Sequence, residues 1–426
     1  MKKIILILIA VIMLCTAAIA ESQSDTGNGI MERFVQREYQ TIWENMADVM
    51  QGSITVDQLT ATVDQLGEIK DYHVLANNEV QGYMVYSYYV CQNNEYVYRL
   101  SIDQDGKLAG FFIQPYTAPA QSDESLHTET ILLRAGKVDE TTAVLTLPDG
   151  DGPFPAVILV QGAGPSDLNE SAYGIHPFLD IAAGLARQGI ASIRYDKYTY
   201  AHPELCVSPD FTVQAEYMLD ADAALAALEA DPRINQVFLV GHSQGGMLMP
   251  RMIAELGADR FSGGISLSGS PLHLWEIIYW QNQDVLSLMN ETDRATYLPV
   301  IEAEADHVRA LAELSAEEVP EGMFFGLPAY YLWDECQTEA VDFVAANNIP
   351  VLFMQGEYDW QVSMDHGLEA WRKLVPQADY AIIPSATHLL TQIDAPTGTQ
   401  VDYKSGAHVC QEAIDTMAAW ILHQAE

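Results

Sequence analysis

The sequence predicts an α/β protein in which a mostly parallel β-sheet carries helices on both faces, preceded by a small α+β domain. Three observations support this fold class. Short apolar runs alternate with helical segments over the later part of the chain, which is typical of parallel strands joined by crossover helices. The first part instead has two helical segments followed by closely spaced strands. A length of 426 residues is more than one average domain needs, so we expect two domains.

Residues 1–20 have the features of a secretory signal peptide. Two lysines precede an apolar run at residues 4–14, and small residues at 18–20 suit cleavage before Glu21. We therefore expect an exported protein, whose polar residues 21–29 form a flexible leader. An uncleaved membrane anchor is the alternative, and no later segment is long and apolar enough to span a bilayer.

Residues 30–115 are expected to form the small α+β domain. Apolar residues at helical spacing predict one amphipathic helix over 30–50 and a second helix that begins near Thr55. Segments rich in Tyr and Val then predict an antiparallel meander. Its strands are expected at 70–76, 80–91, 95–102 and 107–114, with turns at Asn77-Asn78, Asn93-Asn94 and Asp105-Gly106.

A linker is expected at residues 116–127, and residues 128–426 are expected to form the α/β domain. Between residues 271 and 339 the alternation stops, and the chain carries helical patterns and many aromatic residues but no strand. An insertion of that size predicts a helical cap over one edge of the sheet. The strands of the sheet are expected at 129–134, 141–147, 154–160, 191–195, 237–240, 263–267, 350–354 and 380–383.

Residues 241–245 read G-H-S-Q-G and stand between a buried apolar run and a helical segment, which is the context that a nucleophile elbow requires. Such a sharp turn strains its central residue, Ser243, and only small neighbours let the chain pass so closely. The first N–H groups of the following helix then point toward an oxyanion formed there. An ordinary glycine-rich turn with an exposed serine is the alternative, and the flanking strand and helix favour the elbow.

A serine hydroxyl needs a base, and an acid that orients the base, to act as a nucleophile. Asp359 and His388 lie in the loops that follow the last two expected strands. Because parallel strands end at the same edge of a sheet, we expect both side chains to lie near Ser243, in the chain order Ser, Asp, His. Glu357 and Asp365 compete with Asp359 for the role of the acid.

The loop after the strand at 154–160 reads Q-G-A-G-P over residues 161–165. Its two glycines allow the backbone to fold back toward Ser243. The backbone N–H groups of Ala163 and Gln244 are therefore expected to bind the oxyanion. A plain Gly-Pro turn is the alternative.

The formal net charge of −39 disfavours nucleic acid and anionic lipid as partners, and it suits solubility outside the cell. After removal of Cys15 with the signal, Cys91, Cys206, Cys336 and Cys410 remain, widely spaced and without a C-x-x-C motif. We expect no metal site built on them. Four cysteines allow three disulfide connectivities, but a chain of this size does not need disulfides, so their pairing stays open.

From about residue 128 to its end the chain resembles bacterial α/β-hydrolase esterases of the serine aminopeptidase-like and bile-acid-thioesterase-like group. Residues 30–115 are similar to a small domain of unassigned role often found before such esterases. Gln161 departs from the family, which commonly has histidine there. The resemblance implies an α/β-hydrolase fold with a helical cap. It rests on residues 157–165 with Asp167, 194–197, 241–246, 268–272, 355–359 and His388.

Together these features predict an exported serine carboxylesterase for small to medium acyl esters, with Ser243 as nucleophile, His388 as base and Asp359 as its partner. No cofactor, metal or stable membrane insertion is expected, and the partner is a small-molecule ester. A peptidase or thioesterase with the same triad, or a binding protein with an inactive triad, are the alternatives. Aromatic residues of the cap are expected either to line an apolar pocket or to form the cap's own core: Trp275, Tyr279, Trp280, Phe324, Phe325, Tyr330, Tyr331 and Trp333.

Overall fold

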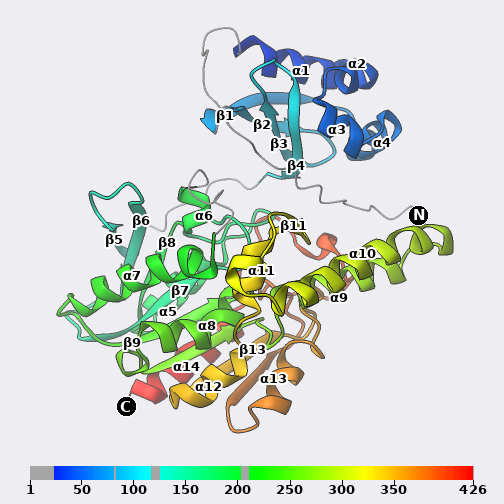
Figure 1. Cartoon of the computed structure of the whole chain (residues 1–426). Coiled ribbons are helices and arrows are strands. Elements are labelled where there is room, and N and C mark those ends of the chain that lie inside the picture. Colours follow the sequence, from blue (N-terminus) through cyan, green and yellow to red (C-terminus); the bar gives the residue numbers. More distant parts are fainter. Residues whose placement is uncertain (1–23, 81–82, 117–124, 203–210, 426) are drawn as a thin grey trace. The chain divides into compact units, whose positions relative to one another are not determined.

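The computed structural model forms two compact units and describes residues 24–80, 83–116, 125–202 and 211–425 (Figure 1). The first unit holds the described residues up to 116, and the second holds those from 125 onward. The expected signal peptide, most of the expected linker and Cys206 lie outside the described residues. Within these ranges, no helix has the length and apolar character that crossing a membrane requires.

The first unit packs four helices and a four-stranded antiparallel sheet of order β1-β2-β3-β4 around one core. Phe34, Tyr88 and Tyr98 are among its fully buried side chains. The capping box of Thr55 and Gln58 starts the last helix, as expected near Thr55. The elements are α1 (Ser24–Gln36), α2 (Tyr39–Glu44), α3 (Asp48–Ser53), α4 (Val56–Leu66), β1 (Asp71–Val80), β2 (Tyr83–Cys91), β3 (Glu95–Ile102) and β4 (Leu108–Pro115).

Local predictions for this unit are wrong in two places. The single helix expected at 30–50 is three helices, and the first begins at Ser24, inside the expected leader. Arg37 ends α1 in a left-handed conformation with φ of 60°. The chain therefore changes direction there, although the helical spacing of apolar residues continues in the sequence. The turn expected at Asn77-Asn78 does not form, because both residues pair with β2 in a long ladder that outweighs their turn preference.

The second unit contains an eight-stranded sheet of order β14-β13-β10-β9-β7-β8-β6-β5. Neighbours from β14 to β8 pair in parallel, whereas β6 pairs antiparallel with both β8 and β5. Each strand expected from the sequence is present, and the predicted fold class is confirmed. The strands are β5 (His127–Leu133), β6 (Thr141–Leu147), β7 (Phe154–Val160), β8 (Ala191–Tyr195), β9 (Ile234–His242), β10 (Gly263–Leu267), β13 (Val351–Gly356) and β14 (Asp379–Ile383).

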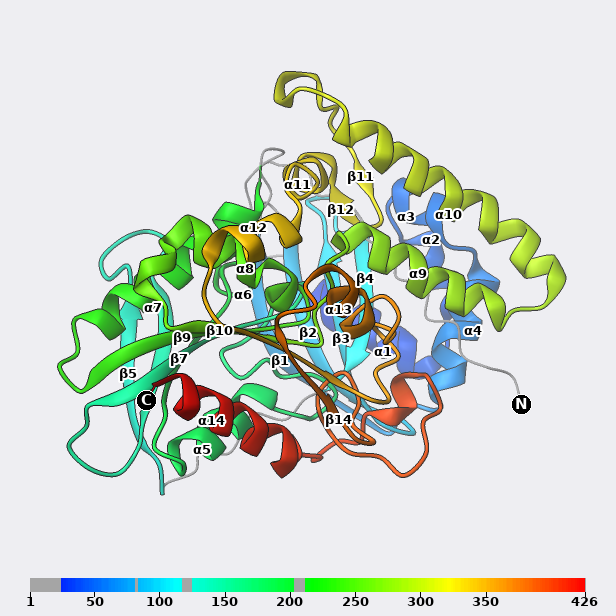
Figure 2. The same cartoon turned by 90° about the horizontal axis from the view of Figure 1, so that it is seen from below.

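Helices cover both faces of this sheet, as Figures 1 and 2 show. On one face α5 (Pro177–Ala186) and α14 (Gln411–Ala425) enclose one apolar core. On the other face α7 (Leu219–Glu229), α8 (Gln244–Leu256), α12 (Ala340–Asn347) and α13 (Leu368–Leu374) enclose a second core. Short helices complete the connections: α6 (Tyr198–Ala201), the π-helix η2 (Gln214–Met218), η3 (Ala258–Arg260) and η5 (Gln400–Asp402).

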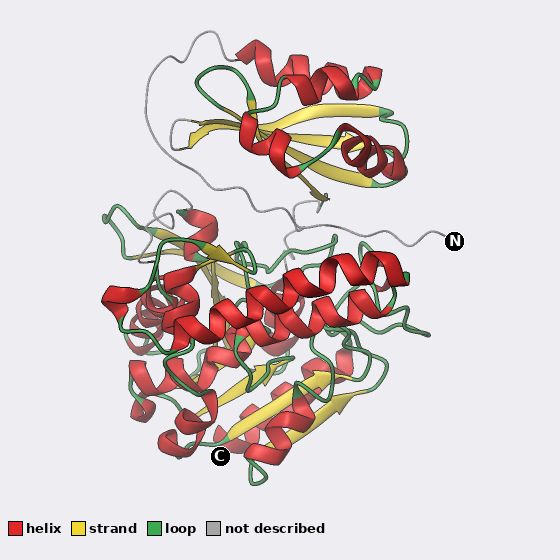
Figure 3. Cartoon of the chain, turned by 45° about the vertical axis from the view of Figure 1, so that its right-hand side comes forward, coloured by secondary structure: helices red, strands yellow, loops and turns green. Residues whose placement is uncertain are grey.

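The expected cap region lies between β10 and β13. Its long helices α9 (Leu274–Ser287) and α10 (Glu291–Ala312) lie side by side (Figure 3). The turn η4 (Ala316–Glu318) leads to α11 (Ala329–Glu335) through the two-residue strands β11 (Met323–Phe324) and β12 (Leu327–Pro328). The expectation that this region holds no strand is therefore wrong, because β11 and β12 pair as a short antiparallel hairpin. In the eight-stranded sheet β14, β13, β10, β9, β7 and β8 run parallel. Their carboxyl ends and the loops that follow them therefore share one edge.

Candidate active site

Ser243 lies on the turn between β9 and α8, with φ of 51° and ψ of −118°. A left-handed φ is strained for serine, so the surrounding structure must enforce it. A Cβ added to Gly241 would lie 2.1 Å from the carbonyl oxygen of Gly245, and one added to Gly245 would lie 2.5 Å from that of Val160. No larger residue fits at either position, so both glycines are required for the turn.

Asp359 and His388 meet at the same edge of the sheet. The Nδ1 atom of His388 lies 2.8 Å from Oδ2 of Asp359, and both side chains are buried. The other carboxylate oxygen of Asp359 accepts the N–H groups of Gln361 and Val362 at 3.0 and 2.9 Å. The carboxylate is therefore fixed, and it holds the imidazole in the tautomer that leaves Nε2 free to accept a proton.

The competitors of Asp359 lie elsewhere. Glu357 accepts the N–H of Ser385 at 2.8 Å, and Asp365 is exposed. Within the described residues neither bonds to His388, so Asp359 alone of the three candidates contacts the imidazole.

The ring of His388 lies against the ring of His242, the residue before Ser243, with centroids 4.7 Å apart. His388 and Ser243 therefore lie at the same sheet edge. Among the described residues no hydrogen bond joins Ser243 Oγ to His388. Such contacts are often long in unliganded enzymes and shorten when substrate binds.

His242 links the loops on either side of the site. Its Nδ1 lies 2.9 Å from Oε1 of Glu170, and its Nε2 lies 2.9 Å from the carbonyl oxygen of His388. Burial lowers the pKa of His242, but the charge and hydrogen bond of Glu170 outweigh it, and the net pKa is raised. The raised pKa favours the protonated ring, which can donate to Glu170 and to the carbonyl oxygen of His388 and so hold the backbone of His388 in place.

Of the two backbone donors expected for the oxyanion, Gln244 directly follows Ser243, and Ala163 lies in the loop after β7. Gln244 is the first residue of α8, and its N–H has no acceptor within the helix. The loop with Ala163 follows β7 and passes close to Ser243, because a Cβ added to Gly162 would lie 2.9 Å from Cβ of Ser243. Gly162 N–H donates to Glu170 Oε1 at 2.7 Å, which fixes the start of this loop.

Gln161, where the resembling family commonly has histidine, is buried at the end of β7. Its side-chain amide donates to the carbonyl oxygen of Tyr195 at the end of β8, and at 3.4 Å to that of Asp167. The substitution therefore keeps a polar group that ties the oxyanion loop to the neighbouring strand.

The cap aromatics divide between several roles. Trp275 belongs to the cap core with Ala305, Val308 and Leu332, and Tyr279, Phe324 and Phe325 pack against it. Trp280 stacks on His366 in the loop after β13, at a centroid distance of 4.5 Å. Tyr331 bonds to the side chain of Gln244 at 2.9 Å. Most of these residues therefore serve the cap itself, and Tyr331 reaches the site.

The sequence reasoning gave no role to several buried polar residues behind the site. Glu170 and His242 pair there. Lys197 bonds to Glu216 and Tyr217, and it also bonds to the carbonyl oxygen of Gly162 in the loop after β7. A histidine next to the nucleophile and a lysine just after a strand were visible signals. Their partners come from other loops, so only the fold identifies the pairs.

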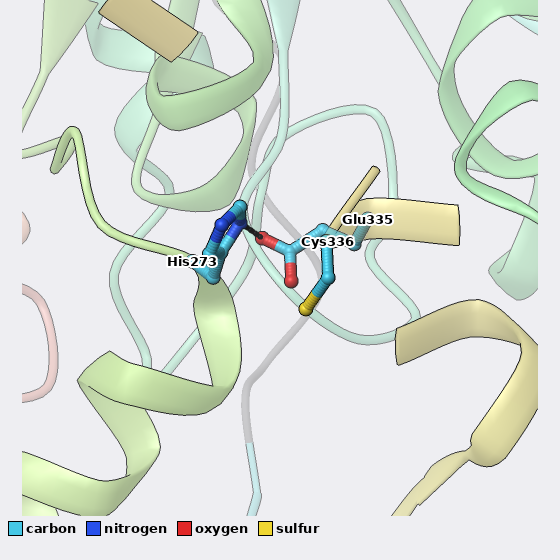
Figure 4. A group of neighbouring side chains, drawn as sticks. All are labelled: His273, Glu335 and Cys336. Atoms are coloured by element: carbon cyan, nitrogen blue, oxygen red, sulfur yellow. Dashed lines mark ion pairs between the residues drawn. The ribbon is translucent and has the colours of Figure 1, made fainter. Parts of the chain in front are cut away.

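Among the described residues one group could hold a metal ion: His273, Glu335 and Cys336, at the base of the cap (Figure 4). His273 Nδ1 lies 3.6 Å from Glu335 Oε1, and its Nε2 lies 3.4 Å from Glu339 Oε1. Burial, followed by the charge of Glu335, raises the pKa of the Cys336 thiol. His273 and Glu335 form an ion pair that joins the start of α9 to the end of α11. Among the described residues, Cys91, Cys336 and Cys410 form no disulfide with one another.

The ion pair of His273 is expected to make stability depend on pH. Burial lowers the pKa of His273, but Glu335, Glu339 and Glu276 outweigh it and raise the pKa to about 9. The folded state therefore gains stability that is complete below about pH 6.5 and is lost as the pH rises through 9. We expect His273→Gln to lower the free energy of unfolding by on the order of 1–3 kcal/mol at pH 6 and by much less at pH 10.

Denaturant unfolding at both pH values measures this difference. The matched control is His307→Gln, which changes an exposed histidine of the same cap. A loss of stability in His273→Gln that is equal at pH 6 and pH 10 would contradict the ion pair.

Comparisons with known proteins identify the family of this chain. Esterase EstD from Thermotoga maritima is 28% identical over 373 residues, which cover 86% of this chain and 85% of that protein. Est1E from Butyrivibrio proteoclasticus aligns over 70% of this chain and 98% of its own, with 18% identity and a TM-score of 0.46. Proline iminopeptidase from Mycobacterium smegmatis aligns over the same shares, with the same identity and TM-score. The model of the alpha/beta hydrolase family matches residues 157–419, more than half of the sequence, and the chain belongs to that family.

Proposed function

We propose that this protein is an exported serine carboxylesterase that hydrolyses esters of small to medium acyl chains. The observation that carries the proposal is the 2.8 Å hydrogen bond between His388 and Asp359, at the sheet edge where Ser243 occupies its strained turn. Family membership supports hydrolysis as the reaction. The similarity to an esterase over most of the chain supports an ester as the substrate.

In the proposed mechanism His388 Nε2 takes the proton of Ser243 as Oγ attacks the ester carbonyl carbon. Asp359 stabilises the imidazolium that results. The negative charge passes to the carbonyl oxygen, which accepts hydrogen bonds from the N–H groups of Ala163 and Gln244. His388 then protonates the leaving alcohol, and an acyl-enzyme remains. Water, deprotonated by His388, releases the acid and restores Ser243.

Removing members of the triad should abolish turnover without unfolding the protein. We expect Ser243→Ala and His388→Ala to lower kcat for p-nitrophenyl butyrate by about 10⁴- to 10⁶-fold, and Asp359→Asn by about 10⁴-fold, because the amide selects the wrong tautomer. A fluorophosphonate should label the wild type once per chain and leave Ser243→Ala unlabelled.

Asp365→Asn is the matched control for Asp359→Asn, because it makes the same change in the same loop on an exposed side chain. It should keep wild-type kcat. If Asp365→Asn loses activity and Asp359→Asn keeps it, the acid has been misassigned. A folded wild type that takes no label would instead favour a binding protein with an inactive triad.

The substrate class separates the esterase from a peptidase or thioesterase with the same triad. We expect kcat/KM for p-nitrophenyl esters to be greatest among acetate to octanoate, and to exceed that for aminoacyl p-nitroanilides. The corresponding acyl thioesters complete the comparison. Faster hydrolysis of the anilides would replace the esterase by a peptidase, and faster hydrolysis of thioesters would replace it by a thioesterase.

Export is the second part of the proposal, and it rests on the sequence of residues 1–20. A positive start, an apolar run and small residues before Glu21 suit a secretory signal. Expression of the full chain in a bacterial host with a Sec pathway should give a mature protein outside the cytoplasm that begins at Glu21. Edman sequencing of that fraction, with a variant lacking residues 2–20 as the control, tests this. A protein that stays in the cytoplasm and begins at residue 1 would contradict export.

A further inference from the structure

We propose that Lys197 is a positioning residue for the oxyanion site: its buried ammonium group holds the peptide that presents the N–H of Ala163, within a hydrogen-bond circuit that also holds Gln244. The inference deepens the proposed serine mechanism and rests on it. Lys197 follows β8 and is 1% exposed.

The ammonium group of Lys197 contacts the carbonyl groups of the two residues that flank Ala163. Its Nζ lies 2.7 Å from the carbonyl oxygen of Gly162 and 3.1 Å from that of Gly164. It also lies 2.7 Å from Oε1 of Glu216 and 2.6 Å from the hydroxyl of Tyr217. Four oxygen atoms therefore surround an ammonium group that has three protons, so each proton has an acceptor within reach.

The geometry of the peptide bond carries this contact to the active site. In a trans peptide the C=O and N–H groups point in opposite directions. The carbonyl of Gly162 is held by Lys197, so the N–H of Ala163 in the same peptide must point away from Lys197. Gly162 lies against Ser243, since a Cβ added to it would be 2.9 Å from Cβ of the serine. Lys197 thus orients an oxyanion donor without touching substrate.

The same circuit reaches the second donor. The hydroxyl of Tyr217 lies 2.9 Å from the carbonyl oxygen of Gly162 and 2.8 Å from Oε1 of Gln244. The amide of Gln244 donates to the hydroxyl of Tyr331 at 2.9 Å, and Tyr331 donates to Oε2 of Glu216 at 2.5 Å. Glu216 closes the ring by pairing with Lys197. Both backbone donors therefore belong to residues held by one buried circuit.

The two tyrosines remain donors across the working pH range. Burial, followed by the charge of Glu216, raises the pKa of Tyr217 and of Tyr331 well above the ordinary value. Both phenols stay protonated, so the direction of the hydrogen bonds does not change with pH. Tyr331 belongs to α11, and the circuit therefore also joins the cap to the first residue of α8.

A charged group is better suited to this position than a neutral donor. Hydrogen bonds from an ammonium group are about twice as strong as neutral ones, so two carbonyl groups of one loop are held against thermal motion. An oxyanion site is effective when its donors are fixed before the charge develops. The alternative is that Lys197 and Glu216 form an ion pair that only stabilises the fold, and the test must separate these roles.

The test replaces the ion pair and then counts turnover per active site. The variant K197M/E216Q removes both charges together, so that neither is left buried alone. We expect kcat for p-nitrophenyl butyrate, per site titrated with a fluorophosphonate, to fall about 10- to 100-fold. This fall is somewhat smaller than the fall in kcat that removal of an oxyanion donor causes. KM should change less than about threefold, because the ground state forms no oxyanion. The Ki of a trifluoromethyl ketone, whose adduct carries the oxyanion, should rise in step with the loss of kcat.

Tyr217→Phe supplies a second variant should the double variant not fold. It removes one hydroxyl and keeps the ring, and we expect kcat per titrated site to fall about fivefold, with the same rise in Ki. Lys373→Met, which removes an exposed lysine from α13, is the matched control and should keep wild-type kinetics. A purely structural role would lower the midpoint of unfolding and the number of titrated sites, but it would leave kcat per site and Ki unchanged, and that result would overturn the proposal.

Ser243→Ala separates a failure of the proposed serine mechanism from a failure of the positioning role of Lys197. If it stays active, the serine mechanism fails and the role of Lys197 fails with it. If Ser243→Ala is inactive while K197M/E216Q and Tyr217→Phe keep kcat per site and Ki, the mechanism stands and the positioning role alone is overturned.

Discussion

The close approach of the backbone at Gly241 and Gly245 is the constraint on which the site depends. The distances there leave no room for a Cβ, so the chain can turn from β9 into α8 within a single strained residue. That turn sets Ser243 at the carboxyl edge of the sheet and makes Gln244 the first residue of a helix, with a backbone N–H free of helical partners. The parallel sheet then brings Asp359 and His388 to the same edge from β13 and β14. The strain at Ser243 is retained because the surrounding sheet holds it.

Buried charges support this edge in pairs. The chain has 20 Lys and Arg residues against 59 Asp and Glu residues, so cations are scarce. Several of them are nevertheless buried: Lys197 pairs with Glu216, and Arg134 pairs with Asp220 at 2.6 Å. Burying an ion pair costs more than burying an apolar pair of similar size, so such pairs contribute specific orientation more than stability. Lys197 contacts the loop after β7, at the carbonyl oxygen of Gly162, which agrees with that role.

The sequence was informative where a local pattern and the fold agree. The eight strands of the sheet follow from apolar runs between helices, and the turn at Ser243 follows from small residues beside a serine. It was misleading where tertiary packing overrides local preference. Asn77 and Asn78 favour a turn, yet they extend a strand because a long ladder with β2 forms around them. An apolar period continues across Arg37, although the helix ends there.

By itself the sequence determined the order of the eight strands of the large sheet along the chain, the alternation that makes most of that sheet parallel, and the residues Ser243, Asp359 and His388 as candidates. These features depend on residue type and spacing along the chain, which a sequence records directly. Only the tertiary structure decided that Asp359, and not Glu357 or Asp365, bonds to His388. It alone brought Lys197 to Gly162 and His242 to Glu170. Those contacts join residues from separate loops, and their existence depends on which loops fold onto the same edge, a property of the packed sheet that no local pattern contains.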